Sequence, residues 1–218
     1  MIYRRGWLDR AQRKLGRFAI PNLMLILVGA MAIVFVMDML ITPVTGHSLQ
    51  EVLYFDRALI MQGQVWRIVT FLFLPPSSSM IFIIFSLYFY WHIGSTLENQ
   101  WGSFGFTAYY ILGAVGAIIA GFITGYATNT YLNLSLFFAF ALLFPDYEIL
   151  LFFFIPVKMK WLAVLDAVGF LMSFVYESWA GRLALIMAVI NVFIFFTPNF
   201  IDWCKSLYRR WKWKQNFK

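Results

Sequence analysis

Few side chains in this chain could take part in chemistry. The 218 residues include two histidines, His47 and His92, and one cysteine, Cys204. The best candidate nucleophile is Ser135, and a base must come within about 3 Å of the proton that it removes. We expect neither histidine to serve Ser135. His92 falls near the inner end of its span, almost a membrane thickness from Ser135, whereas distance alone does not exclude His47, because its loop is long. A lone cysteine excludes an internal disulfide and a cysteine-cluster metal site.

Arg67 is the other chemically notable residue, beside Trp66 in the mostly apolar stretch "GQVWRIVTFLFLPP". A buried arginine costs several kcal/mol unless its five N–H donors find partners. A snorkelling arginine at the start of a span is the ordinary arrangement, although Arg67 precedes the next apolar span by a dozen residues.

Composition places these residues in a membrane. The chain is 62% hydrophobic and 12% charged, with a mean hydropathy of +0.75, whereas soluble domains are about half apolar and a quarter charged. A span needs about 20 mainly apolar residues. We therefore predict an all-α polytopic membrane protein whose membrane domain, residues 20–200, has six spans: 20–42, 80–97, 104–126, 131–145, 161–177 and 182–199.

Two connections are unusual. Residues 43–79 form a long first outer loop with apolar stretches. Residues 145–160, "PDYEILLFFFIPVKMK", are too apolar for a simple loop and too short for a span. Backbone at such depth must be satisfied internally or lie at the interface, so we expect an interfacial hairpin or a re-entrant segment.

Basic residues set the expected orientation. The basic, amphipathic segment 1–19 carries six Lys/Arg, the basic aromatic tail 201–218 carries six, and Lys158 and Lys160 lie on the same side of the six-span scheme, giving fourteen of 17. The positive-inside rule then makes both termini cytoplasmic. We expect contact with the anionic inner leaflet, no nucleic-acid partner, and a bacterial plasma membrane as the location.

Small residues recur every four positions in the third span, at Gly113, Ala117, Gly121 and Gly125. Such spacing lets another helix approach closely. Internal packing is the favoured use, and a dimer face is the alternative.

A longer pattern joins Trp66-Arg67 to "HIGSTLENQWGSFGFTAYY", residues 92–110, with Gly94, Leu97, Glu98, Trp101 and Gly102 at fixed spacing. This pattern resembles the rhomboid superfamily of intramembrane serine proteases and its inactive relatives, including the derlins. The resemblance implies a six-helix rhomboid-like bundle with a membrane-dipping first outer loop. It also implies a structural clamp of that loop by Trp66, Arg67, Glu98, Trp101 and Gly102.

The chain departs from the proteases at the positions that would carry catalysis. Leu134 and Leu136 flank Ser135, and no glycine of the proteases' Gly-x-Ser-Gly turn lies near it; Thr130 is an alternative alignment for the nucleophile. Gly181 stands at the expected histidine, while Ala184 and Ala188 keep the close-packing spacing. Phe82 and Ser86 stand where the second span would carry its histidine and asparagine.

The resemblance therefore implies a catalytically inactive protein that binds transmembrane segments of client proteins without cleaving them, with no cofactor and no metal. Two alternatives are kept. One is a serine protease with a rearranged site at Ser135. The other is a small transporter in which Asp38 and Asp166 bind a proton or cation. For Asp166 we expect a local ion pair with Lys158 or Lys160, or a wet helix end.

Overall fold

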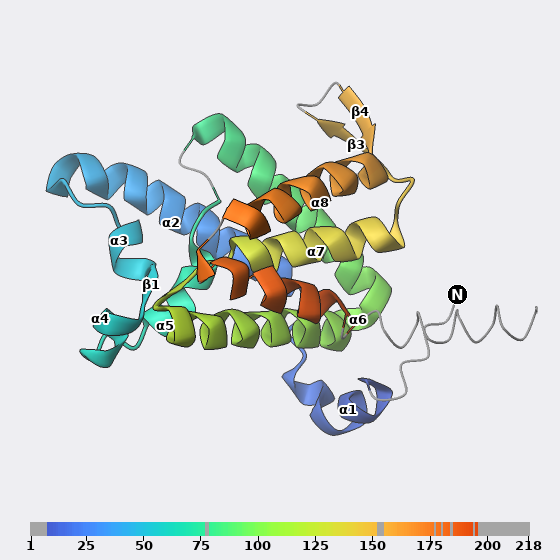
Figure 1. Cartoon of the computed structure of the whole chain (residues 1–218), viewed down its shortest axis with the longest axis horizontal. Helices are drawn as coiled ribbons and strands as arrows, with labels where there is room; N and C mark the ends of the chain where they lie inside the picture. The colour runs from blue at the N-terminus through green and yellow to red at the C-terminus, as the bar shows by residue number, and fades with distance from the viewer. Residues whose placement is uncertain are drawn as a thin grey trace, which may run out of the picture.

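The computed structural model describes residues 8–76, 79–151, 155–176, 178–179, 181–183, 185–193 and 195. The described chain is mostly helical (Figure 1). A short helix α1 (Leu8–Leu15) and a 3₁₀ turn η1 (Gly16–Phe18) precede the first long helix, α2 (Leu23–Thr45). The predicted C-terminal tail, residues 201–218, lies outside the described residues.

Three of the described helices are long and apolar enough to cross a membrane: α2, α6 (Met80–Thr124) and α8 (Met159–Tyr176). The mostly helical, membrane-type architecture is thus confirmed, and the prediction of six spans is wrong. Two predicted spans, 80–97 and 104–126, correspond to the two parts of α6 on either side of the non-helical Gly102. The predicted fourth span is α7 (Thr130–Leu143), whose 14 residues reach about 21 Å, less than the roughly 30 Å hydrocarbon core. The last is the short helical segment Gly181–Phe193.

Helix α6 changes direction at Gly102. Its φ of 75° and ψ of 158° lie outside the helical region, a backbone conformation that glycine adopts without steric cost. The two parts of α6 run in different directions in Figure 1. Because apolar residues lie on both sides of the bend, the sequence predicts two spans here. In the structure the two helical parts meet directly at one glycine.

The first loop, between α2 and α6, is folded over its described residues 46–76. It contains the short helices α3 (Gln50–Leu53), α4 (Arg57–Met61) and α5 (Arg67–Thr70), and a 3₁₀ turn η2 (Phe71–Phe73). Its strand β1 (Phe55–Asp56) pairs antiparallel with β2 (Tyr126–Ala127), which follows α6. Helix α2 runs three residues beyond the predicted end, through Pro43, and Gly46 caps it in the left-handed region.

The connection from α7 to α8 is an antiparallel hairpin of β3 (Glu148–Leu151) and β4 (Ile155–Lys158). Of the two alternatives for residues 145–160, the described backbone has the hairpin. Two ion pairs close it: the Lys160 ammonium lies 2.8 Å from the Asp146 carboxylate and Lys158 lies 3.9 Å from Glu148. Both lysines therefore already have acidic partners.

Two of the small residues in α6 allow close packing inside the chain. A methyl group at Gly113 would collide with Leu132 of α7 and lie 2.7 Å from the Asn191 amide. One at Gly121 would lie 2.7 Å from the Phe55 ring and 2.8 Å from Ala127. Gly125 has a different role, because it ends α6 at φ 96°. Ala117 packs at the edge of the core, and Ala184 lies outside the described residues.

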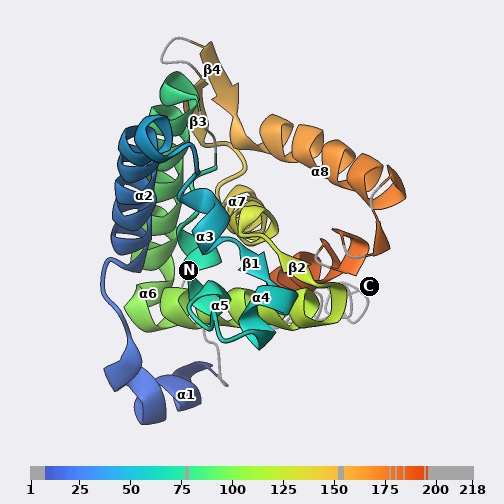
Figure 2. The ribbon, with the colours of Figure 1, turned by 90° about the vertical axis from the view of Figure 1, so that its left-hand side faces the viewer.

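Helix α7 occupies the middle of the molecule. Figure 2 shows it nearly end-on, between α2 and the first part of α6 on one side and α8 on the other. Its buried residues include Leu132, Leu136 and Phe140. By contrast, Met159 is the one residue of α8 whose side chain is buried among those described. The core therefore lies between α2, α6 and α7, and α8 stands at its edge.

Candidate functional site

Arg67 organises the first loop. Its side chain is 4% exposed. Nη1 donates to the carbonyls of Glu51 at 2.9 Å and Tyr54 at 3.0 Å, and Nε donates to the Gln64 side chain at 2.7 Å. The guanidinium also lies 4.8 Å from the centre of the Tyr54 ring. These bonds offset much of the cost of burying the charge. They also tie α5 to the segment around α3, and we call this arrangement the Arg67 clamp.

The neighbours of Arg67 complete this arrangement. Trp66 Nε1 donates to the Val52 carbonyl at 3.3 Å, and Thr70 Oγ1 donates to the Leu53 carbonyl at 2.8 Å. Side chains around α5 therefore bind four successive carbonyls, those of residues 51–54. The last four carbonyls of a helix have no partner within it. Three of the bound carbonyls, those of residues 51–53, belong to the end of α3, and that of Tyr54 follows directly. Helix α3 is too short to be stable alone.

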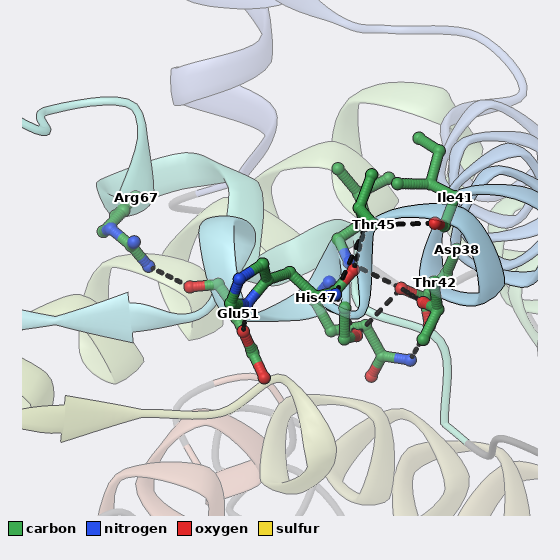
Figure 3. Close-up of polar contacts among 10 residues, drawn as sticks. Asp38, Ile41, Thr42, Thr45, His47, Glu51 and Arg67 are labelled. Carbon is green, nitrogen blue, oxygen red and sulfur yellow. Dashed lines mark hydrogen bonds and ion pairs between the residues drawn. The ribbon is translucent and has the colours of Figure 1, made fainter.

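Asp38 fixes the entrance to the same loop (Figure 3). Its carboxylate accepts hydrogen bonds from Ser48 Oγ at 2.8 Å, from the Leu49 backbone N–H at 2.6 Å and from the Gln50 amide at 2.9 Å. Thr42 Oγ1 donates to it from one turn along α2 at 3.2 Å. The transporter alternative assigned Asp38 to ion binding. In the structure its oxygens are instead occupied in joining α2 to α3.

Asn129 ties the loop to the start of α7. Its amide donates to the carbonyls of Leu72 at 3.2 Å and Leu74 at 2.9 Å, and the side chain is buried. Neither Asn129 nor Asp56 was among the residues predicted from the sequence. Asp56 caps α4 by accepting hydrogen bonds from the Ala58 and Leu59 N–H groups. Both are Asn or Asp residues directly before a helix, which is the signal that could have found them.

The five residues predicted as one clamp form two separate clusters, so that grouping was wrong. Glu98 accepts hydrogen bonds from the Asn22 backbone N–H at 2.8 Å and from Ser103 Oγ at 2.7 Å. It thus joins the beginning of α2 to the bend at Gly102. Trp101, in the same turn, packs its ring 5.1 Å from that of Tyr109. The two halves of the motif could not be separated from the sequence, because spacing along the chain does not say which end of a helix each half lies near.

Ser135 is 1% exposed within α7. Its hydroxyl donates to the Leu132 carbonyl at 2.7 Å, and its own carbonyl accepts from the Tyr109 hydroxyl at 2.9 Å. A serine bonded back to the preceding turn is an ordinary helical arrangement. Thr130, the alternative nucleophile, opens α7, and its N–H and hydroxyl contact Thr128.

The structure does not bring the other predicted catalytic positions to Ser135. Ala188 and Asn191 line a small cavity with it, whereas Gly181 lies seven residues before Ala188, about two turns. Phe82 and Ser86 occupy the first two turns of α6, where Phe82 is half exposed. His92 pairs with the Tyr147 hydroxyl at 2.8 Å, and His47 is exposed 3.7 Å from Glu51.

A lateral groove lies between α7, α8 and the segment Gly181–Phe193. Its volume is about 600 Å³. Its walls are apolar apart from Ser135 and, at one end, Lys160. Four alanines are among the lining residues: Ala141, Ala163, Ala167 and Ala188. Ala163 and Ala167 are one turn apart on α8 and form a small-residue patch next to Phe170 and Leu171 of the same lining.

Asp166 lies on α8 between residues that line this groove, although it is not itself a lining residue. Ala163 and Phe170, one turn before and one turn after it, are lining residues. The predicted ion pair with Lys158 or Lys160 is wrong, because Glu148 and Asp146 take those cations. Among the described residues, Asp166 makes no hydrogen bond or ion pair.

No family model, no curated protein and no solved structure matches the chain. The features that bear on function are therefore the geometry of the first loop and the lateral groove.

Proposed function

We propose that this membrane protein is a non-proteolytic, rhomboid-like binder of transmembrane helices, and that the lateral groove receives the client helix. The observation that carries the proposal is the groove itself, with about 600 Å³ of apolar space against a helix, α8, that has little contact with the core.

Small residues favour a helix as the occupant. In lipid, helices associate through close packing and not through expulsion of water, and alanine or glycine faces permit that approach. The groove offers Ala163 and Ala167 on α8, Ala141 on α7 and Ala188 opposite. Lining residues 160–171 of α8 extend over about 17 Å, which matches three turns of a partner helix.

The chemistry around Ser135 supports binding over cleavage. A hydrolase needs an activated nucleophile and donors aimed at the oxyanion. The Ser135 hydroxyl is bonded to Leu132, and its described neighbours include no histidine.

Binding can be measured with a fluorescent 21-residue Leu/Ala transmembrane peptide and the full chain in lipid nanodiscs. We expect saturable binding that Ala167→Trp weakens at least tenfold by filling the groove. Leu165→Trp, on an exposed face of α8, is the matched control and should bind like the parent. Equal binding to both variants, or a phospholipid that occupies the groove in native mass spectrometry and blocks the peptide, would overturn the proposal.

A further inference from the structure

A further cavity, which we call the hairpin cavity, lies between the first part of α6 and the β3–β4 hairpin. Its volume is about 210 Å³, and it shares no lining residue with the lateral groove. One wall is a single stripe of α6, with residues three and four apart, and the other wall is strand β3 with the residue before it. The lining residues are Phe85, Tyr88, Phe89 and His92 of α6, and Tyr147, Glu148, Ile149 and Leu150 on the hairpin side.

Aromatic rings make up most of this lining, since five of the eight residues carry one. The Tyr88 ring stacks on that of His92 with the centroids 6.1 Å apart, and the His92 ring lies 5.5 Å from that of Tyr147. A hydrogen bond of 2.8 Å between His92 Nε2 and the Tyr147 hydroxyl joins the two walls. The faces of aromatic rings carry negative potential and attract ammonium groups, so the lining favours a cationic ligand.

Glu148 adds a negative charge to the same lining. Its side chain is 58% exposed and lies 3.9 Å from the ammonium of Lys158, its partner across the two strands. A charge-assisted hydrogen bond between an ammonium and a carboxylate is about 2.7–2.9 Å long, so this ion pair is a loose one. The Glu148 carboxylate can therefore accept from another N–H donor, while Lys158 places a cation just beside the cavity.

The cavity lies near the level of the lipid headgroups. The hairpin carries four charged side chains in its two ion pairs, and such groups avoid the hydrocarbon core. Tyr88 and Trp91, whose rings are 6.0 Å apart, are both exposed on α6, and tyrosine and tryptophan gather at the membrane interface. The apolar side chains of Ile149 and Leu150 continue the lining and suit the part of a lipid that follows its headgroup.

We propose that the hairpin cavity binds the headgroup of a zwitterionic phospholipid, phosphatidylethanolamine. Its ammonium has three N–H donors and no acceptor, so it fits against the Tyr88 and Tyr147 rings and donates to Glu148. The phosphate of the same headgroup then pairs with Lys158. Phosphatidylglycerol carries the phosphate without the ammonium and lacks the group that the rings and the carboxylate attract. Because the cavity is separate from the lateral groove, this inference does not rest on the proposed function.

Competition between the two lipids tests the inference. The full chain in detergent receives equal amounts of phosphatidylethanolamine and phosphatidylglycerol, and native mass spectrometry counts the lipids that it retains. We expect phosphatidylethanolamine to be retained about fivefold more often, from a cation–π contact and an exposed charge pair. Glu148→Gln should abolish this excess, because it removes the charge that attracts the ammonium. Tyr88→Leu should reduce it, because it removes one ring face.

Matched controls address the freed lysine and the lost ring. Asp146→Asn frees Lys160 as Glu148→Gln frees Lys158, but Asp146 does not line the cavity, so this variant should retain phosphatidylethanolamine like the parent. Trp91→Leu, which removes an exposed ring outside the lining, should do the same. Glu148 and Tyr88 are both exposed, so their variants should melt like the parent in lipid-free detergent, and either variant alone decides the inference.

Four results would overturn the inference. The first is equal retention of the two lipids by the parent, and the second is an unchanged excess in Glu148→Gln. The third is a loss in Asp146→Asn as large as in Glu148→Gln, which would show an effect of surface charge alone. The fourth is displacement of the lipid by an equal concentration of soluble phosphoethanolamine, which would assign the cavity to a water-soluble amine. Ala167→Trp, which fills the lateral groove, should leave the excess unchanged, and a loss there would place the lipid in that groove instead.

Discussion

Arg67 should contribute more to stability than any exposed arginine of the first loop. Arg67→Ala leaves the carbonyls of Glu51 and Tyr54 without their donor, so we expect a loss of about 2–4 kcal/mol in the free energy of unfolding in detergent. Arg67→Lys should restore only part, because an ammonium lacks the planar fork. Arg57→Ala is the control. The exposed Arg57 side chain makes one hydrogen bond among the described residues, to the Phe122 carbonyl, so its loss should cost less than about 1 kcal/mol. Equal melting of all three variants and the parent would contradict the clamp.

Restoring one missing catalytic residue should not create a protease. Gly181→His alone places its imidazole about two helical turns from Ala188, the residue that lines a cavity with Ser135. The Ser135 hydroxyl stays bonded to the Leu132 carbonyl, and losing even one oxyanion donor can slow hydrolysis 100-fold or more. We expect no labelling of Gly181→His by a fluorophosphonate probe and no cleavage of a rhomboid substrate in proteoliposomes. Labelling that disappears in the double variant with Ser135→Ala would move the enzyme alternative to first place.

At the scale of the elements, the β3–β4 hairpin has a titratable fastening. The hydrogen bond from the Lys160 ammonium holds the pKa of Asp146 below its ordinary value. The pair therefore stabilises the hairpin above the unfolded pKa, about 3.9, and this contribution is lost as the pH falls through the lower folded value. Carboxyl-carbon NMR should show the Asp146 midpoint rising toward its ordinary value in Lys160→Met. Lys158→Met should move it less. An unchanged midpoint in Lys160→Met would show that the bond is absent.

The elements also show what sequence could predict here. The sequence narrowed residues 145–160 to a hairpin or a re-entrant segment, because the run is too apolar for a simple loop and too short for a span. The need of Arg67 for acceptors was foreseeable, because a buried guanidinium demands them. The number of spans was not, because hydropathy measures the length of apolar runs and not whether a glycine bends one helix, as Gly102 does. The role of Asp38 in joining α2 to the loop could not be predicted, because its four donors come from residues up to twelve positions away and meet only when the loop folds.

At the scale of the whole molecule, hydrogen bonds indicate which ends of the helices share a side of the membrane. Glu98 joins the bend of α6 to Asn22 at the start of α2, and the basic N-terminal segment favours the cytoplasm for that side. The β1–β2 pair joins the first loop to the other end of α6, so the loop belongs to the opposite side. This arrangement predicts opposite accessibility for two exposed positions, Gln100 near the bend and Met61 in the loop.

Cysteine labelling tests that prediction in a Cys204→Ser background. A membrane-impermeant maleimide should label Met61→Cys on intact cells, because the loop faces outward. It should label Gln100→Cys only after permeabilisation, because the bend lies beside the basic N-terminal segment. In the parent chain, which retains Cys204, that cysteine should also react only after permeabilisation, because the basic tail is expected to follow the same charge rule. Labelling of Gln100→Cys on intact cells would invert the arrangement. It would also place Lys158 and Lys160 outside, because His92, in the same part of α6 as Gln100, bonds to Tyr147 at the base of their hairpin.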